Sequence, residues 1–245
     1  MIARPVVLAV GAVAPSAGDG VVGDAAVLHE IDCRAVAIVT SVMGRVTGRP
    51  LVEPLPEALL ERQIAAAVAG PRPEGARIGL LVDPGQVALI ATTIERAVPD
   101  VAVYAPVVTM QGETLLDAKT LEAARRELYG RARVVVIRAK DAERLAGNAV
   151  DGFDDLRAAA EEMLRRGARA AIVAGFQAHG RVADVVNDGG TITLLDAPRI
   201  QAAHVDGLAG AYATAVAGHL ARGAAPARAA EAAQRYVAMR LMRGR

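Results

Sequence analysis

Short apolar runs recur along this chain, and stretches with helical spacing of apolar residues separate them. The runs are rich in Val, Ile, Leu and Ala, and most of them end at Gly, Pro or a polar residue. Continuous apolar runs of this length are typical of strands that are buried on both faces, as in a parallel sheet. We therefore predict strands at residues 5–10, 35–40, 76–82, 101–105, 132–137 and 169–174.

The segments that follow these runs are predicted to be helices. They cover residues 21–30, 56–70, 84–97, 118–129, 152–166, 210–222 and 226–243, and Asp117 is expected to cap the helix at 118–129. Strands that alternate with helices predict right-handed parallel units and an α/β fold with a mainly parallel central sheet flanked by helices. We expect one domain that spans residues 1–245.

Three segments depart from this alternation. Asn187-Asp188-Gly189-Gly190 lies between apolar runs at 182–186 and 191–195, which predicts a β-hairpin. Residues 48–56 carry Gly and Pro at turn spacing, and 196–206 is expected to begin in a turn.

Composition narrows the class of protein. Hydrophobic residues make up 53% of the chain but aromatic residues only 2%, so the core must be built from Ala, Val, Leu and Ile. The net charge of +1 gives no electrostatic reason to expect nucleic acid or a membrane surface as a partner. The single cysteine, Cys33, excludes an internal disulfide. No apolar run reaches the length of about 20 residues that a membrane span needs, and a cytoplasmic protein is expected.

Two glycine-containing loops are the candidate functional segments. The first, residues 11–20, follows the first predicted strand, and the second, residues 206–210, opens directly into a helix of small residues. Backbone N–H groups and the helix dipole at such an opening favour an anion. Local chemistry alone leaves the alternative that each loop is an ordinary connection with small residues for tight packing.

The second loop carries a family resemblance. Ala197-Pro198-Arg199-Ile200 followed by Gly207-Leu208-Ala209-Gly210 resembles the last signature of the hydroxymethylpyrimidine/phosphomethylpyrimidine kinases of the ribokinase-like superfamily. That signature reads A-P-R-I, a spacer and G-T-G-C. Further matches follow in the same order from residue 6 to about residue 236: Pro15-Ser16, Gly18, Gly20, Asp24, Arg77-Ile78-Gly79, Pro106-Val107 and Asp117.

The resemblance implies a ribokinase-like fold with a small β flap, usually dimeric, and ATP-dependent phosphorylation of the pyrimidine unit of thiamine with Mg²⁺. It implies that Gly207, Ala209 and Gly210 form the anion hole for the transferred phosphoryl group. The implied substrate pocket contains Gly11, Ser16, Gly18, Gly20 and Arg45, of which Arg45 replaces a Gln. The implied nucleotide-binding positions are Arg138, Asp141 and Ala174, and Asp141 falls on the acid that orders magnesium-bound water.

Several substitutions fall on the catalytic positions of the resembling kinases. The base position is Gly210, a phosphate-contacting Lys is replaced by Ala174, and an organising Asp is replaced by Ala105. Phosphoryl transfer depends on positioning and electrostatic stabilisation, so we expect weak or lost activity. Asp206 is the nearest acid that could replace the base.

Two functions therefore stay open. One is an ATP-dependent kinase with weak activity. The other is a non-catalytic relative that binds a small anionic metabolite in the old substrate pocket, which the donor-only side chains of Arg45 and Arg138 would favour.

Overall fold

The structure is a computed structural model, and it describes residues 4–15, 18–46, 49–98, 100–110, 112–147, 149–201 and 206–243. The strands are β1 (Val6–Val13), β2 (Arg34–Val46), β3 (Arg49–Pro54), β4 (Gly75–Ile78), β5 (Ala102–Tyr104), β6 (Thr109–Met110), β7 (Glu113–Thr114), β8 (Val134–Arg138), β9 (Ala171–Ala178), β10 (Arg181–Asn187) and β11 (Ile192–Pro198). The helices are α1 (Gly20–Glu30), α2 (Glu57–Val68), α3 (Pro84–Ala97), α4 (Ala118–Glu127), the 3-10 turn η1 (Ala139–Asp141), α5 (Ala142–Ala146), α6 (Phe153–Arg165), α7 (Leu208–Ala221) and α8 (Pro226–Arg243).

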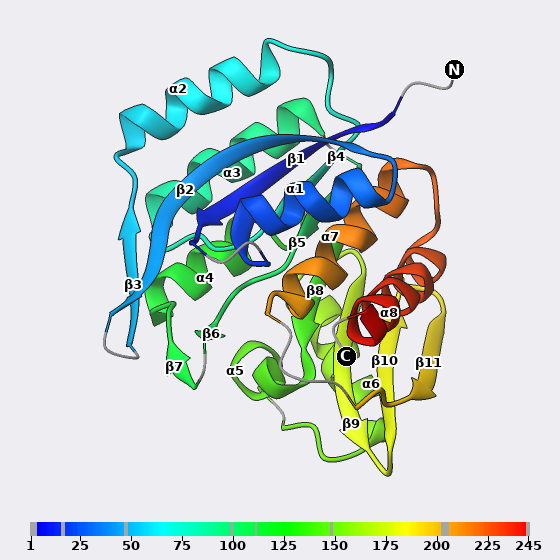
Figure 1. Ribbon diagram of the computed structural model, residues 1–245. Coiled ribbons are helices and arrows are strands. Elements are labelled where there is room, and N and C mark those ends of the chain that lie inside the picture. Colours follow the sequence, from blue (N-terminus) through cyan, green and yellow to red (C-terminus); the bar gives the residue numbers. More distant parts are fainter. Residues whose placement is uncertain are drawn as a thin grey trace.

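One large sheet runs through the molecule. Its strand order is β11-β10-β9-β8-β5-β4-β1-β2-β3 (Figure 1). The six strands from β9 to β2 pair in parallel, whereas β3, β10 and β11 are antiparallel to their neighbours. The prediction of a mainly parallel α/β sheet flanked by helices is confirmed.

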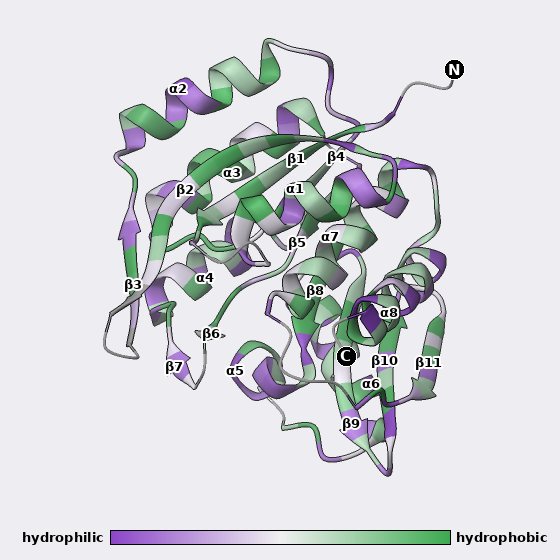
Figure 2. Cartoon of the chain, in the orientation of Figure 1, coloured by the Kyte–Doolittle hydropathy of each residue, from purple (hydrophilic) through white to green (hydrophobic). Residues whose placement is uncertain are grey.

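Helices cover both faces of this sheet. On one face, α1, α7 and α8 pack against alternate strand residues such as Val7, Ala9 and Val103. On the opposite face, α2 to α6 pack against the residues between them, such as Leu8, Val10 and Tyr104 (Figure 1). Figure 2 shows the apolar residues concentrated on the central strands and on α7, with hydrophilic residues on outer helices such as α2. Because the central strands are covered on both sides, their sequences are apolar without alternation.

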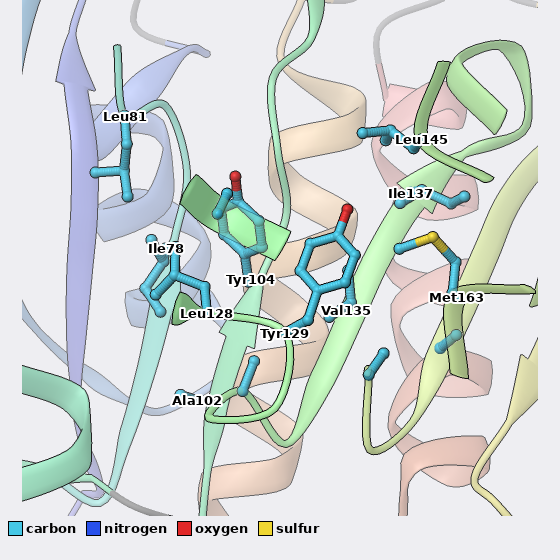
Figure 3. Close-up of a cluster of buried hydrophobic side chains, with 14 of the residues drawn as sticks. Ile78, Leu81, Ala102, Tyr104, Leu128, Tyr129, Val135, Ile137, Leu145 and Met163 are labelled. Atoms are coloured by element: carbon cyan, nitrogen blue, oxygen red, sulfur yellow. The ribbon is translucent and has the colours of Figure 1, made fainter. Parts of the chain in front are cut away.

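The core on the α2–α6 face contains a rare aromatic contact. The rings of Tyr104 and Tyr129 lie 6.1 Å apart between centroids, and Figure 3 shows them side by side between Ile78 and Val135. Both tyrosines are buried. Elsewhere the core consists mostly of Ala, Val, Leu and Ile, as the composition predicted.

Several predicted boundaries were wrong: the strand predicted at 76–82 ends at Ile78, the one predicted at 169–174 continues to Ala178, and three further differences affect the loops and the flap. The loop predicted at 11–20 begins late, because β1 continues through Gly11 to Val13, with a bulge where its pairing to β2 shifts after Gly11. The second strand continues past residue 40 to Val46, because its end pairs with β3 and forms a hairpin in the predicted flap region. The turn predicted at Asp196 is strand β11, which stays in antiparallel register with β10 as far as Pro198. The predicted hairpin at 187–190 is confirmed by the Asn187–Ile192 pair.

The capping prediction is also confirmed. The side chain of Asp117 accepts a hydrogen bond from the backbone N–H of Thr120 at 2.7 Å, at the start of α4. Of the helices within the described ranges, none is long and apolar enough to cross a membrane.

Candidate functional site

The two glycine loops meet at the carboxyl ends of the strands. A Cβ atom placed on Gly207 would lie 1.7 Å from the carbonyl oxygen of Gly18, so the loop backbones are in direct contact. The φ angle of Gly207 is 73°, a left-handed conformation that favours glycine. Both loops therefore lie at the same end of the sheet.

The first loop is closely packed against its own strand and helix. A Cβ atom on Gly20 would lie 2.1 Å from the carbonyl oxygen of Ala12, and one on Gly23 would lie 2.4 Å from that of Gly18. Gly11, predicted to line the pocket from this loop, lies instead within β1, where it pairs with Val39. Ser16 lies outside the described residues, and so does the side chain of Arg45, whose backbone pairs with Pro50 at the end of β2.

The second loop presents a helix opening. Gly207 is the N-cap of α7, and Leu208, Ala209 and Gly210 form its first turn, closed by the hydrogen bond from Ala211 N–H to Gly207 at 2.8 Å. The N–H groups of a first helical turn have no partner within the helix, and the dipole favours negative charge there. Ala209 and Gly210 therefore lie in the helix itself, and Gly210 contributes no side chain that could act as a base.

Asp206 lies next to this opening. Its Cβ atom is 3.5 Å from the position that a Cβ atom on Gly18 would take. The acid is thus at the contact between the two loops, one residue before the N-cap of α7.

A buried ion pair lies directly behind the first turn of α7. Nη1 of Arg77, on β4, is 3.4 Å from Oδ2 of Asp24, on α1, and both side chains are at least 95% buried. The Thr214 hydroxyl can donate to Oδ1 of Asp24 at 2.5 Å or to the carbonyl of Gly210 at 2.8 Å. Burial raises the pKa of Asp24 above its usual range, while the charge of Arg77 and the Thr214 hydroxyl oppose that rise.

The predicted nucleotide-binding residues gather at the ends of β8 and β9. Arg138 and Ala174 are register partners in these two strands, and Asp141 ends the 3-10 turn that follows β8. Nε of Arg138 donates to Oδ2 of Asp141, and its Nη2 donates to the backbone carbonyl and hydroxyl of Thr109 at 2.8 and 2.9 Å. The Thr109 hydroxyl is 2.8 Å from Oδ1 of Asp141. We call these three residues the Arg138 cluster.

The Arg138 cluster does not fit a magnesium ion in this arrangement. Both carboxylate oxygens of Asp141 already accept hydrogen bonds, and a guanidinium lies against one of them. Magnesium binds through free carboxylate oxygens and waters, and a neighbouring positive charge opposes it. In the part of the chain that the structure describes, no group of three or more His, Cys, Asp or Glu residues could hold a metal ion.

The strand beside the Arg138 cluster offers backbone rather than side-chain groups. Ala174 has no polar side chain, and Gly175 adopts a φ of 80° where β9 and β10 lose their regular register. The Gly175 N–H donates to the carboxylate of Asp184 at 2.7 Å, and Gln234 donates to the other oxygen at 3.1 Å. Burial raises the pKa of Asp184.

Other predicted features lie apart from these groups. Ala105 is buried after β5 and offers no charge. A hollow of about 440 Å³ lies along α4 beside the start of α3, and none of the predicted site residues lines it. Its lining residues are Pro84, Ala118, Lys119, Glu122, Ala123 and Arg126.

Sequence reasoning missed two groups of the site. Arg77 was recognised only as part of a motif, although a lone arginine in an apolar strand with glycine two residues to either side signals a buried charge that needs a partner. Thr109 carries no comparable signal, since its role depends on where a short two-stranded sheet brings it.

The comparisons with known proteins identify the family of the chain. The sequence model of the family described as phosphomethylpyrimidine kinase matches residues 14–244. The chain is 28% identical over 234 residues to the hydroxymethylpyrimidine/phosphomethylpyrimidine kinase of Streptomyces coelicolor, covering 95% of this chain and 87% of that protein. It is 25% identical over 224 residues to the kinase of the same name from Bacillus subtilis, covering 90% and 83%.

A solved structure gives the same fold. The pyridoxal kinase from Staphylococcus aureus in complex with AMP-PCP superimposes with a TM-score of 0.89 at 26% identity, covering 96% of this chain and 87% of that one. The family match extends over nearly the whole chain and includes residues 14–20 of the first glycine loop and all of the second. The chain therefore belongs to the phosphomethylpyrimidine kinase family.

Proposed function

We propose that this family member binds a small anionic ligand at the glycine loops and transfers phosphoryl groups slowly or not at all. The observation that carries the proposal is the contact between Gly18 and Gly207, which holds the anion-binding first turn of α7 in place without any of the replaced side chains. The ligand class is a pyrimidine or related ring that carries a phosphate, as the names of the relatives suggest.

The same site lacks what transfer requires. Deprotonating a substrate hydroxyl needs a base within hydrogen-bond reach, and Gly210 supplies none. Ala174 supplies no charge to the nucleotide phosphates, and the carboxylate of Asp141 is held by Arg138. Binding through backbone N–H groups survives these replacements, whereas charge stabilisation in the transition state does not.

The test compares binding with turnover. We expect calorimetry to detect hydroxymethylpyrimidine phosphate, while assays with ATP and hydroxymethylpyrimidine, its phosphate or pyridoxal give turnover far below the usual kinase range of about 1–100 s⁻¹. Gly210→Cys alone should leave the rate low, because Ala105 and Ala174 remain. Ordinary kinase turnover by the unmodified protein would overturn the proposal.

A second candidate is an active ATP-dependent kinase in which Asp206 is the base. The placement of Asp206 beside Gly18, at the opening of α7, favours it, and the nucleotide analogue bound by the S. aureus kinase makes ATP the expected co-substrate. Asp206→Asn would then lower kcat by about 100-fold or more with a smaller effect on KM. Asp188→Asn, at the tip of the β10–β11 hairpin, is the control and should leave kcat unchanged.

We also propose a cytoplasmic homodimer. The hairpin of β2 and β3 exposes Val42 and Leu51 on one face, about half of each residue being accessible. Exposed apolar residues on a flap are suited to an interface between copies. Light scattering that shows a monomer at micromolar concentration would contradict this.

A further inference from the structure

A buried guanidinium faces the first turn of α7. Nη2 of Arg77 lies 3.6 Å from the position that a Cβ atom on Gly210 would take, and Nη1 lies 3.6 Å from that of Gly11. A Cβ atom on Gly79 would lie 1.7 Å from Nη1. Only a glycine at position 79 leaves the space that the guanidinium occupies, and a side chain at position 210 would be in van der Waals contact with it.

The hydrogen bonds of this guanidinium are incomplete. Nε of Arg77 and Oδ2 of Asp24 are both buried, and neither has a hydrogen-bond partner among the residues that the structure describes. The 3.4 Å contact between Arg77 and Asp24 is thus an ion pair without a hydrogen bond. A guanidinium carries five N–H donors, and buried donors are normally satisfied. The side chain is held by a counter-ion but retains donors for a further acceptor.

We propose that Arg77 donates hydrogen bonds to a phosphate group of the ligand bound at the N-terminus of α7, with Asp24 as the counter-ion that holds the guanidinium in position. This inference rests on the proposed function and adds the residue that selects the charge of the ligand.

The geometry explains why the ligand group is a phosphate. Nη2 of Arg77 lies beside Gly210, the third residue of the first turn of α7, so the guanidinium is close to the backbone N–H groups that this turn leaves without helical partners. A planar guanidinium fork matches phosphate oxygens and forms charge-assisted hydrogen bonds. The absence of a side chain at Gly210 matters, because a carboxylate there would itself pair with Arg77 and take the place of the phosphate.

The first experiment uses that competition. Inorganic phosphate is titrated into the full-length wild type, Gly210→Asp and Gly210→Asn, with binding followed by calorimetry. We expect Gly210→Asp to weaken binding about tenfold or more, because the new carboxylate occupies Arg77, and Gly210→Asn to weaken it less than about threefold. Asn has nearly the same size, so equal losses in the two variants would show a steric effect and overturn the inference.

A second pair of variants tests Arg77 itself. Arg77→Lys keeps the charge and loses the fork, while Gly79→Ala keeps Arg77 but places a methyl group where Nη1 now lies. Each should weaken phosphate binding about tenfold, with folding checked by circular dichroism. If either fails to fold, the Gly210 pair decides alone.

The outcomes separate the two proposals. Weaker phosphate binding in folded Arg77→Lys or Gly79→Ala, together with a larger loss in Gly210→Asp than in Gly210→Asn, supports the role of Arg77. Phosphate that binds wild type and all folded variants equally overturns that role and leaves the proposed anion site standing. Phosphate that fails to bind wild type overturns both.

Discussion

The opening of α7 and the Arg138 cluster both lie at the carboxyl ends of strands in the same sheet, but they consist of different kinds of groups. The opening of α7 consists of backbone groups, held by glycine contacts between Gly18 and Gly207. The Arg138 cluster consists of side chains whose donors and acceptors satisfy one another. A site made of backbone groups keeps its ligand preference when side chains are replaced. A site made of side chains changes when one of them is replaced. Here the side chains of the Arg138 cluster form hydrogen bonds with one another.

The largest effect is expected from breaking the backbone site. Gly207→Ala places a methyl group 1.7 Å from the Gly18 carbonyl and forces a left-handed φ on a residue with a Cβ atom. We expect a loss of roughly 2–4 kcal/mol in the free energy of unfolding, measured with urea, and loss of phosphate binding.

Gly223→Ala is the matched control at the other end of α7. Gly223 also has a positive φ, of 87°, but a Cβ atom there has no neighbour within 4 Å among the described residues. Only the strain of about 1–2 kcal/mol should remain, with phosphate binding unchanged. Equal losses in the two variants would show that the loop contact contributes nothing.

A smaller effect is expected from breaking the Arg138 cluster. Asp141→Ala removes the carboxylate shared by Arg138 and Thr109, and we expect a loss of about 1–3 kcal/mol in the free energy of unfolding. Phosphate binding at α7 should not change, because none of its donors belongs to this cluster. Asp196→Ala, which removes the surface partner of Arg181, should cost less than about 1 kcal/mol. A loss of phosphate binding in Asp141→Ala would show that the two regions form one site.

The smallest effect is a pH dependence beside the Arg138 cluster. The raised pKa of Asp184 means that the folded state binds its proton more tightly than the unfolded state does. The stabilisation from this proton is complete below the unfolded pKa of 3.8 and is lost as pH rises through the higher folded pKa. The free energy of unfolding of wild type relative to Asp184→Asn should therefore fall as pH rises from 3.8 through the raised folded pKa. Urea titrations that give a constant difference would contradict this.

Most of the fold could be predicted because a strand that is buried on both faces is apolar at nearly every position, and this pattern is visible in the sequence. Runs such as Val134–Ile137 are apolar throughout, and their helices follow with clear caps such as Asp117. The missed boundaries are places where pairing with a distant strand decides the structure. The end of β2 is extended because β3 lies beside it, and the sequence of residues 41–46 does not indicate that a partner strand is present.

The site was predictable to the extent that it depends on glycine. Gly207 and Gly18 were placed correctly because a helix opening and a tight loop each require such residues. The pairing of Arg77 with Asp24 joins β4 to α1, which are far apart in the sequence. Local sequence patterns cannot predict which distant residue becomes the partner of a buried arginine. The hydrogen bond from Arg138 to the carboxylate of Asp141 depends on side-chain rotamers, which are determined by packing in the folded structure.

Gly218, near the end of α7, has a consequence for the energetics of binding. A Cβ atom there would lie 2.4 Å from Cδ1 of Ile31, so side chains at the end of α1 pack directly against the backbone of α7. From Ala211 to Gly218 the helix is buried on all sides, and its amide hydrogens should exchange with solvent only when the whole domain unfolds. The helix that presents the anion-binding groups is thus ordered before the ligand arrives. Little conformational entropy is left to lose on binding, and a weak ligand such as free phosphate should produce a measurable rise in Tm.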